Sequence, residues 1–168
     1  MAEVHAYVFS MLTMQRLTLQ EGFLAKHPGA WIIWEPVVWK PSALNPNSSQ
    51  TLPVSFSTRP QERPEGDALC FELSGTEPVK LGRAPDCDIR INDGAVSREH
   101  LWLRGTSDAT WRLTPASPSA KTLHNGEPLT SEGTDLLPGD ELRVGGVILR
   151  FEDAATMSYR LDRAAQGH

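Results

Sequence analysis

The stretch LGRAPDCDIRINDGAVSREH, residues 81–100, holds three arginines, one serine, one histidine and two glycines. Asp, Asn, Pro and Gly interrupt every apolar run within it, which is typical of short strands separated by loops. Gly82-Arg83 ends one strand, and two loops are predicted at 84–88 and 92–98, with a short strand between them. Because loops gather at the ends of a β-sandwich and often carry function, this stretch is the first candidate for a site.

Residues 67–153 around this stretch follow an all-β pattern. In ALCFEL, the side chains of Leu69, Phe71 and Leu73 alternate onto one face. A similar alternation runs through VILRF, and each run is bounded by Gly, Pro, Asp, Asn or Ser. Short alternating strands at this spacing predict a sandwich of two antiparallel sheets.

Two dipeptides mark tight hairpins within this region. Asn125-Gly126 and Gly145-Gly146 each separate two strand-like runs, and a two-residue turn of this kind needs a positive φ at its central positions. No helix-length periodic segment interrupts the strands before residue 153, and the tail at 154–168 is predicted to form a short helix.

The first 66 residues predict an N-terminal extension rather than part of the sandwich. A short helix is expected over residues 15–30, where Thr18 and Glu21 fit a capping box. Residues 31–41 are rich in Trp, Ile and Val and contain two prolines, which favours extended backbone. Residues 42–66 have a linker composition, so we place the domain boundary near Gly66.

Three of the five tryptophans lie in the extended segment: Trp31, Trp34 and Trp39. Two interpretations stay open for them. Burial against the main domain would contribute about 2–3 kcal/mol for each ring. A surface for a second partner is the alternative, because tryptophan is favoured at interface hot spots.

Composition excludes several classes of function. The net charge of −5 and the absence of a basic patch disfavour nucleic-acid binding. No apolar run is long enough to span a membrane, and Glu3 and His5 stand where an export signal carries Lys or Arg. Cys70 and Cys87 form neither a disulfide framework nor a metal-ligand spacing. We therefore expect a cytoplasmic protein without a metal, a cofactor or a membrane contact.

The opening stretch suits one ligand especially, a phosphate dianion. If both of its loops lie at one end of the sandwich, Arg83, Ser97 and Arg98 come together. Arginine offers a planar fork that matches phosphate oxygens, and a serine hydroxyl adds a further donor. These three residues are therefore the candidate phosphate contacts.

The combined motifs resemble the forkhead-associated (FHA) domain. They are Gly82-Arg83, the segment SREH at 97–100, Asn125-Gly126 and the segment LPGDEL at 137–142. The resemblance implies a sandwich of about eleven strands, in keeping with the strand pattern read independently above. It also implies recognition of phosphothreonine peptides, and hence a signalling adaptor whose partner is a Ser/Thr kinase or a kinase substrate.

The resemblance also implies a role for each matching residue. Arg83 is similar to the arginine that meets the phosphate or the neighbouring peptide backbone, and Ser97 to the serine that bonds a phosphate oxygen. Arg98 occupies the position of a second phosphate contact. The loop-bracing positions are Gly82, His100, Asn125 and Gly126.

One loop departs from the family pattern, the segment before Asn125. Ser119 falls where a Ser or Thr touches the phosphate, and Lys121 replaces a glycine. Ala120 falls where the family carries an asparagine that grips the peptide backbone. Ser119 and Lys121 remain candidate contacts, and a phosphate-independent interaction module with a degenerate site is the alternative function.

Two further interpretations of the opening stretch need comparison with the phosphate site. Arg83 and Arg98 could pair on the surface with nearby acids, which would contribute only about 0–1 kcal/mol per pair. Ser97 and His100 could be taken as nucleophile and base, but no G-x-S-x-G elbow surrounds the serine. We therefore expect no catalytic residue and no enzyme activity.

Overall fold

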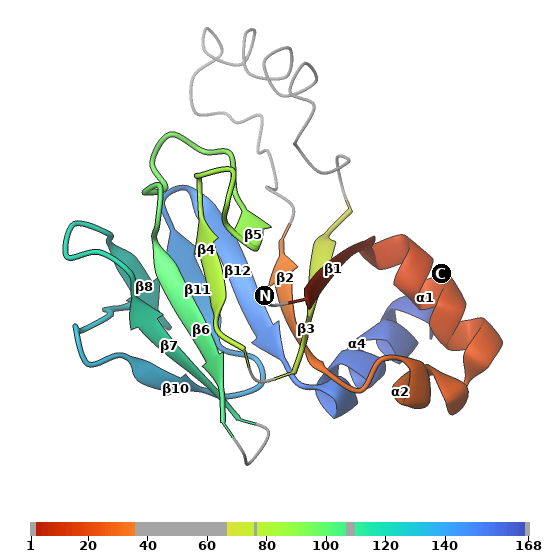
Figure 1. Ribbon diagram of the computed structural model, residues 1–168. Helices are drawn as coiled ribbons and strands as arrows, with labels where there is room; N and C mark the ends of the chain where they lie inside the picture. Colours follow the sequence, from red (N-terminus) through yellow and green to blue (C-terminus); the bar gives the residue numbers. More distant parts are fainter. Residues whose placement is uncertain (1–2, 36–66, 76, 107–109, 167–168) are drawn as a thin grey trace, which may run out of the picture.

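The computed structural model describes residues 3–35, 67–75, 77–106 and 110–166. In these ranges the chain forms two β-sheets and three helices, arranged as three layers (Figure 1). The five-stranded sheet faces the seven-stranded sheet, and the helices cover the other face of the seven-stranded sheet. The predicted sandwich of two sheets is therefore confirmed.

The seven-stranded sheet has the order β1-β3-β2-β12-β11-β8-β9. All of its pairs are antiparallel. Its strands are β1 (Glu3–Val8), β2 (Ala30–Trp34), β3 (Leu69–Ser74), β8 (Thr122–His124), β9 (Glu127–Pro128), β11 (Glu141–Val144) and β12 (Val147–Glu152).

The five-stranded sheet has the order β10-β7-β6-β4-β5, with one parallel pair between β4 and β5. Its strands are β4 (Val79–Gly82), β5 (Ile89–Arg90), β6 (Leu101–Gly105), β7 (Trp111–Pro115) and β10 (Thr134–Leu136). The sheets thus hold twelve strands in the described residues, where the resemblance implied about eleven.

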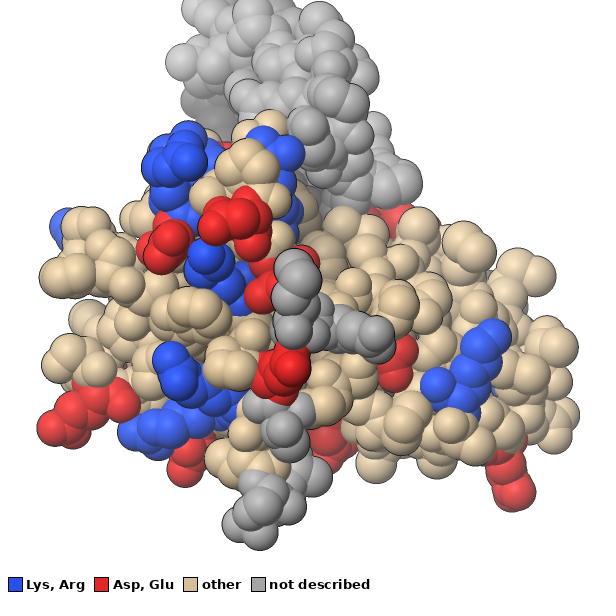
Figure 2. All heavy atoms as spheres, viewed as in Figure 1, with Lys and Arg blue, Asp and Glu red and all other residues tan. Residues whose placement is uncertain are grey.

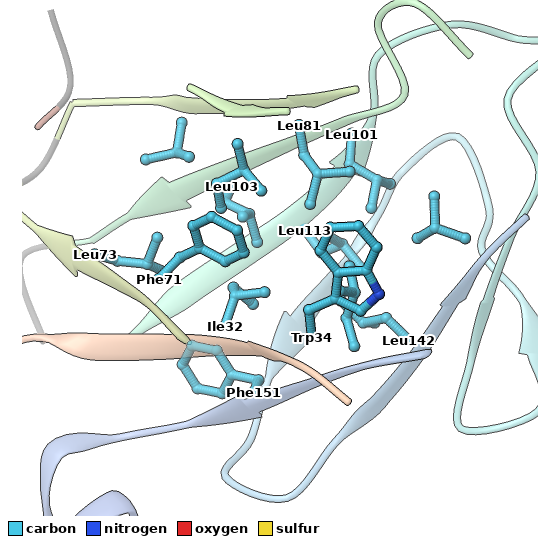
Figure 3. Close-up of a cluster of buried hydrophobic side chains, with 14 of the residues drawn as sticks. Ile32, Trp34, Phe71, Leu73, Leu81, Leu101, Leu103, Leu113, Leu142 and Phe151 are labelled. Carbon is cyan, nitrogen blue, oxygen red and sulfur yellow. The ribbon is translucent and has the colours of Figure 1, made fainter. Parts of the chain in front are cut away.

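The main core lies between the two sheets and consists of alternating inward-facing side chains (Figure 3). Phe71 and Leu73 of β3 point into it, with Leu69 packed beside them, as the alternation in the sequence predicts. The inward positions of β12, Val147, Leu149 and Phe151, are buried in the same cluster.

A second core lies between the seven-stranded sheet and the helices. The helices are α1 (Phe9–Leu19), α2 (Gly22–Lys26) and α4 (Ala154–Gln166). Strand β2 separates the two cores: Ile32 and Trp34 face the sandwich, whereas Trp31 and Ile33 face the helices. A strand covered on both faces needs apolar residues at successive positions, which explains the run AWIIW.

The N-terminal segment differs from the extension that the sequence predicts. Strand β2 lies between β3 and β12 in the middle of the sheet, and β1 adds an edge strand to β3. Trp31 and Trp34 are therefore buried inside the molecule. Trp39 and the linker at 42–66 lie outside the described residues.

The predicted helix at 15–30 is wrong in its bounds. The first helix, α1, already begins at Phe9, and it ends at Leu19 because Gln20 adopts a positive φ of 52°. Thr18 thus stands at the end of a helix rather than at its start, and no side-chain cap precedes α2. The predicted C-terminal helix is confirmed as α4, where Asp153 Oδ1 accepts the Thr156 backbone N–H at 2.8 Å.

The two predicted hairpin turns have different geometry. Asn125 and Gly126 both have positive φ, at 52° and 86°, as predicted for the turn between β8 and β9. In the turn between β11 and β12, Gly145 has a φ of 62°, but Gly146 does not adopt positive φ. The prediction for the second position of that turn is therefore wrong. None of the helices in the described ranges is long and apolar enough to cross a membrane.

Candidate functional site

The two loops of the opening stretch lie at one end of the sandwich, above β4 and β5 in Figure 1. Backbone hydrogen bonds join them directly: the Arg83 N–H donates to the Ser97 carbonyl at 3.0 Å, and the Ala84 N–H donates to the Arg98 carbonyl at 3.1 Å. Arg83, Ser97 and Arg98 are therefore neighbours, although up to fifteen positions separate them in the sequence.

Gly82 makes this close approach sterically feasible. A Cβ atom at this position would lie 2.3 Å from the Arg98 carbonyl oxygen and 3.0 Å from the Ser97 carbonyl oxygen. Both contacts are with backbone atoms, which cannot move aside without separating the two loops. The glycine is thus required by contact with the neighbouring loop rather than by an unusual φ angle.

The hydrogen-bonding groups of these side chains are engaged to different degrees. Arg83 is half-buried, and its Nε–H donates to the Val96 carbonyl at 3.1 Å. Arg98 is exposed, and its guanidinium makes no hydrogen bond or ion pair within the described ranges. The Ser97 hydroxyl likewise has no hydrogen-bond partner among the residues described. The site therefore presents uncommitted donors from two adjacent residues beside a guanidinium that is held in place.

In the described residues, the nearby acids form ion pairs with Lys80 rather than with Arg83 or Arg98. Lys80 forms ion pairs with two of these acids: its Nζ atom lies 3.0 Å from Asp86 Oδ2 and 3.6 Å from Glu99 Oε2. The hydrogen bond with Asp86 raises the pKa of Lys80 and lowers the pKa of that exposed carboxyl group. The other two acids accept hydrogen bonds from the backbone: Asp88 from the Lys80 N–H and Asp93 from the Ala95 N–H. No ion pair joins Arg83 or Arg98 to these acids within the described ranges, although the charge of Arg98 contributes to the lowered pKa of Asp86.

Charged side chains of both signs gather at this end of the molecule (Figure 2). Two residues that the sequence did not single out as candidates also bond the backbone of these loops. The Arg90 Nε–H donates to the Arg83 carbonyl at 3.2 Å, and the thiol of Cys87 donates to the Arg98 carbonyl at 3.2 Å. Burial raises the pKa of Cys87, which keeps it a neutral thiol. Both residues belong to the opening stretch, but their contacts depend on how the loops fold back, which no local motif indicates.

His100 lies behind these loops and is almost fully buried, with 1% of its surface exposed. Its Nδ1 atom accepts the Ser97 backbone N–H at 2.9 Å, and its Nε2 atom lies 2.9 Å from the Lys121 carbonyl oxygen. A backbone N–H can only donate and a carbonyl can only accept, so these partners require the neutral tautomer with hydrogen on Nε2. Burial lowers the pKa of His100 in spite of the hydrogen bond to Lys121, which favours the same neutral form.

The contact between Ser97 and His100 is made by the backbone, not by the serine hydroxyl. A nucleophile needs its hydroxyl within hydrogen-bond reach of the base. Within the described ranges, His100 has both ring nitrogens occupied by backbone groups, so it does not serve as the base for Ser97.

The third loop, residues 116–121, is connected to the first two through His100. The Ala116 N–H donates to the His100 carbonyl at 3.0 Å, in addition to the bond between Lys121 and the imidazole ring. Ser119 is exposed, and its hydroxyl lies 2.9 Å from the Ser117 hydroxyl within the same loop. The Lys121 side chain is exposed, whereas Ala120 has no polar side chain to offer a peptide. In the described residues, no hydrogen bond joins Ser119 to Arg83 or Ser97.

Asn125 joins a different pair of segments, while the described residues show no contact of this kind for Gly126. Asn125 Oδ1 accepts the Glu141 backbone N–H at 2.8 Å, and Asn125 Nδ2 donates to Asp140 Oδ1 at 3.1 Å. The same carboxylate accepts the His124 Nε2–H at 2.8 Å. Burial alone would raise the pKa of Asp140, but its hydrogen bonds with His124, Leu137 and Asn125 hold the pKa below its ordinary value. This cluster fixes the β8–β9 turn against the segment before β11.

The fold and the site motifs together define an FHA-type domain. Residues 67–155 match the family model described as the inner membrane component of T3SS, cytoplasmic domain, and this match covers about half of the chain. The chain therefore belongs to this family, whose domain is of the FHA type. No curated protein matches the chain.

Solved FHA domains are similar to parts of the chain. The FHA domain of an Arabidopsis thaliana hypothetical protein is 27% identical over 53% of this chain and 75% of that chain, with a TM-score of 0.47. The N-terminal FHA domain of Rad53p from S. cerevisiae, in complex with a phosphothreonine peptide, is 20% identical over 61% and 93% of the two chains, with a TM-score of 0.48. The FHA domain of the CT664 protein from Chlamydia trachomatis is 18% identical over 53% and 87%, with a TM-score of 0.48.

Proposed function

We propose that the loops at 83–88 and 92–100 bind a phosphothreonine-containing segment of a partner protein. The observation that carries this proposal is the position of Arg98 and Ser97 beside Arg83. The Arg98 guanidinium and the Ser97 hydroxyl make no hydrogen bond or ion pair among the described residues, although four acidic residues lie in the same loops. A ligand that brings its own negative charge completes these hydrogen bonds.

The chemistry of a phosphate dianion fits this arrangement. Its oxygens accept several hydrogen bonds at once, and a hydrogen bond to a charged group contributes about 1.5–3 kcal/mol. Arg83, Ser97 and Arg98 supply three contacts, which would support micromolar binding, about −8 kcal/mol, after the ordering costs are subtracted. Lys121 adds a positive charge from the loop that His100 holds in place. Ser119, in the same loop, would supply a second hydroxyl besides that of Ser97.

The family supports a binding module rather than an enzyme. The chain belongs to a family of FHA-type domains, and the similar domain of Rad53p was determined in complex with a phosphothreonine peptide. The partner in this proposal is a Ser/Thr kinase or one of its substrates, and the module acts without a cofactor. The family description refers to a cytoplasmic domain, which supports a cytoplasmic location.

One observation favours a second function, a protein-interaction module that ignores phosphate. Ala120 stands where the family resemblance implies an asparagine that holds the peptide backbone, and an alanine provides no such hydrogen bond. Under this alternative the same loops would contact a partner through shape and backbone groups, and the arginines would be dispensable.

A peptide array separates the two functions. Degenerate peptides with a fixed phosphothreonine, phosphoserine or unmodified threonine would be probed with the full 168-residue chain and with Ser97→Ala. The proposal predicts selective retention on the phosphothreonine set, lost in Ser97→Ala but kept in the control Ser131→Ala, an exposed serine outside the three loops. Equal retention on phosphorylated and unmodified peptides would favour the phosphate-independent module and overturn the proposal.

A further inference from the structure

Strand β1 leaves one edge of the seven-stranded sheet open. Among the described strands it pairs with β3 alone, through six residue pairs from Glu3 to Val8. The sequence EVHAYV contains no Pro, Lys or Gly. Proteins commonly protect sheet edges with prolines, lysines or bulges, because outward N–H and C=O groups pair readily with another strand. β1 has none of these residues, so its outer backbone groups form a template for a further strand.

An apolar surface lies next to this edge, on helices α1 and α2. Eight large hydrophobic side chains are exposed in the described residues, and five of them belong to this helical segment. These five are Met11 (57%), Met14 (68%), Leu17 (58%), Leu19 (37%) and Leu24 (40%). Three of the five line a shallow groove of about 330 Å³, whose lining residues are Met11, Met14, Gln15, Thr18, Leu19 and Lys26.

The open edge and the apolar surface are parts of one face. β1 ends at Val8 and α1 begins at the next residue, Phe9, so the strand leads directly into the helix (Figure 1). The surface over α1 and α2 carries few charged residues, in contrast to the end of the sandwich (Figure 2). A contiguous apolar area of this kind on a folded protein indicates an interaction site.

We propose that this face binds a second copy of the chain. A partner that fits this face needs an unpaired strand edge with an apolar helix beside it. This chain has both, because β1 is followed directly by α1. A two-fold axis perpendicular to the sheet would pair β1 with β1 of the second copy in antiparallel fashion. The same axis keeps the two α1 helices on one side of the joined sheet, so that their exposed methionines and leucines meet. Stable interfaces bury about 1,200–2,000 Å², more than a six-residue strand supplies, which is why the helices must take part.

The two faces of β1 restrict the register of this pairing. Val4 packs against the core between the sheets, whereas Tyr7 packs against the core beneath the helices. Residues directly opposite each other in an antiparallel pair point to the same side, so inward residues must oppose inward residues. An axis through any one residue of β1 satisfies this rule, and the proposed axis passes through Ala6, which leaves Glu3 outside the paired segment. This axis sets Val4 opposite Val8 of the second copy and His5 opposite Tyr7 of the second copy.

The charges around this face suit a symmetric contact. In the proposed register no acidic residue of β1 opposes another, because Glu3 lies beyond the paired segment. Lys26 lines the groove, and Glu21, at the other end of α2, is exposed. In an isologous contact, each of these opposite charges can meet its counterpart on the second copy. Lys26 and Glu21 thus allow two acidic chains to associate at this face.

Sedimentation velocity over a range of concentrations tests the surface. The full chain is expected to sediment as a dimer that dissociates on dilution. Met14→Glu should weaken the dimer at least tenfold, because it brings two carboxylates into the apolar contact. The matched control is Leu137→Glu, since Leu137 is exposed to a similar extent, 65% against 68%, but follows β10 and belongs to neither α1 nor α2. A chain that stays monomeric throughout, or a dimer that Met14→Glu leaves unchanged while far-UV circular dichroism shows both variants folded, would overturn the proposal.

Mild oxidation of cysteine variants tests the axis. Ala6→Cys places two thiols directly opposite each other across the two-fold axis. In His5→Cys each thiol lies opposite Tyr7 of the second copy, so the two thiols are offset by two residues along the strands. Both positions are exposed, and the native Cys70 and Cys87 are buried. Ala6→Cys should form a covalent dimer even when diluted, and His5→Cys should not. Equal cross-linking of both variants, or none of either, would contradict the proposed pairing.

Discussion

The imidazole of His100 connects the Ser97 backbone N–H, at 2.9 Å, with the Lys121 carbonyl oxygen, also at 2.9 Å. A single buried ring thus joins the loop that carries Ser97 and Arg98 to the loop that carries Ser119 and Lys121. The ring adds to the backbone hydrogen bonds that Arg83 and Ala84 make with the Ser97 and Arg98 carbonyls. Its removal should therefore affect both stability and ligand binding.

Replacement of His100 by alanine should lower the free energy of unfolding by about 2–4 kcal/mol. The substitution leaves the Ser97 N–H and the Lys121 carbonyl without their partner and creates a cavity beneath the loops. Urea denaturation followed by tryptophan fluorescence measures the change. Ser119→Ala is the control, because it removes only an exposed hydroxyl of the same loop, and a similar loss in both variants would contradict the role of the ring.

The stability of the chain should also depend on pH through His100. Burial lowers its pKa in the folded state below the ordinary value of 6.5. Between these two values the unfolded chain binds more protons than the folded chain, so the free energy of unfolding decreases as the pH falls. The contribution is fully present above about pH 6.5 and falls below it by at most about 1.4 kcal/mol per pH unit. Parallel urea titrations between pH 8 and pH 5 should show a shallower decrease for His100→Ala, and identical slopes would rule out this origin.

Gly82 and Gly94 form a matched pair for testing the contact between the loops. Gly82→Ala would place a methyl group 2.3 Å from the Arg98 carbonyl oxygen, whereas no atom lies within 4 Å of a Cβ at Gly94. We expect Gly82→Ala to destabilise the fold by about 2–4 kcal/mol and Gly94→Ala to change it by less than about 0.5 kcal/mol. Thermal unfolding of the two variants measures the difference. A Gly82→Ala variant as stable as Gly94→Ala would mean that the two loops do not pack this closely.

Asp140 should contribute to stability through its hydrogen bonds. It accepts from His124, Asn125 and the Leu137 backbone N–H. Asp140→Asn turns one oxygen into a donor that faces these donors, and we expect a loss of about 2–3 kcal/mol. The control is Asp135→Asn, since the Asp135 side chain is 69% exposed and its ion pair with Arg112 lies at the surface. Equal stability of the two variants in guanidinium chloride would exclude a structural role for the Asp140 cluster.

The strands between residues 67 and 153 could be predicted because their information is local. Leu69, Phe71 and Leu73 alternate with period two and face the core between the sheets. The turn at Asn125-Gly126 needs residues that tolerate positive φ, and both adopt it. The proximity of Arg83 and Ser97 could be predicted because loops cluster at the ends of the sheets in a β-sandwich.

The N-terminal part could not be predicted because its structure depends on partners distant in the sequence. In sequence, β2 resembles any extended apolar segment. Its place in the sheet is set by its pairing with β3 and β12, which lie far from it in the sequence. α1 has a single buried residue, Leu12, and hydrophobic residues on its exposed side, so its sequence gives no clear amphipathic pattern. The capping-box pattern of Thr18 and Glu21 favoured a helix start, but the positive φ of Gln20 ends α1 there instead.

The most direct test of phosphate recognition is calorimetric titration with the peptide pair that the array selects, phosphorylated and unphosphorylated at one threonine. The account predicts micromolar binding of the phosphorylated peptide alone. Arg83→Ala and Arg98→Ala should each weaken it by one to two decades, about 2–3 kcal/mol. Arg104→Ala, an exposed arginine of β6, should leave the affinity unchanged. Equal affinity of the wild-type chain for both peptides, or unchanged binding by Arg98→Ala, would contradict the claim that these loops read a phosphate.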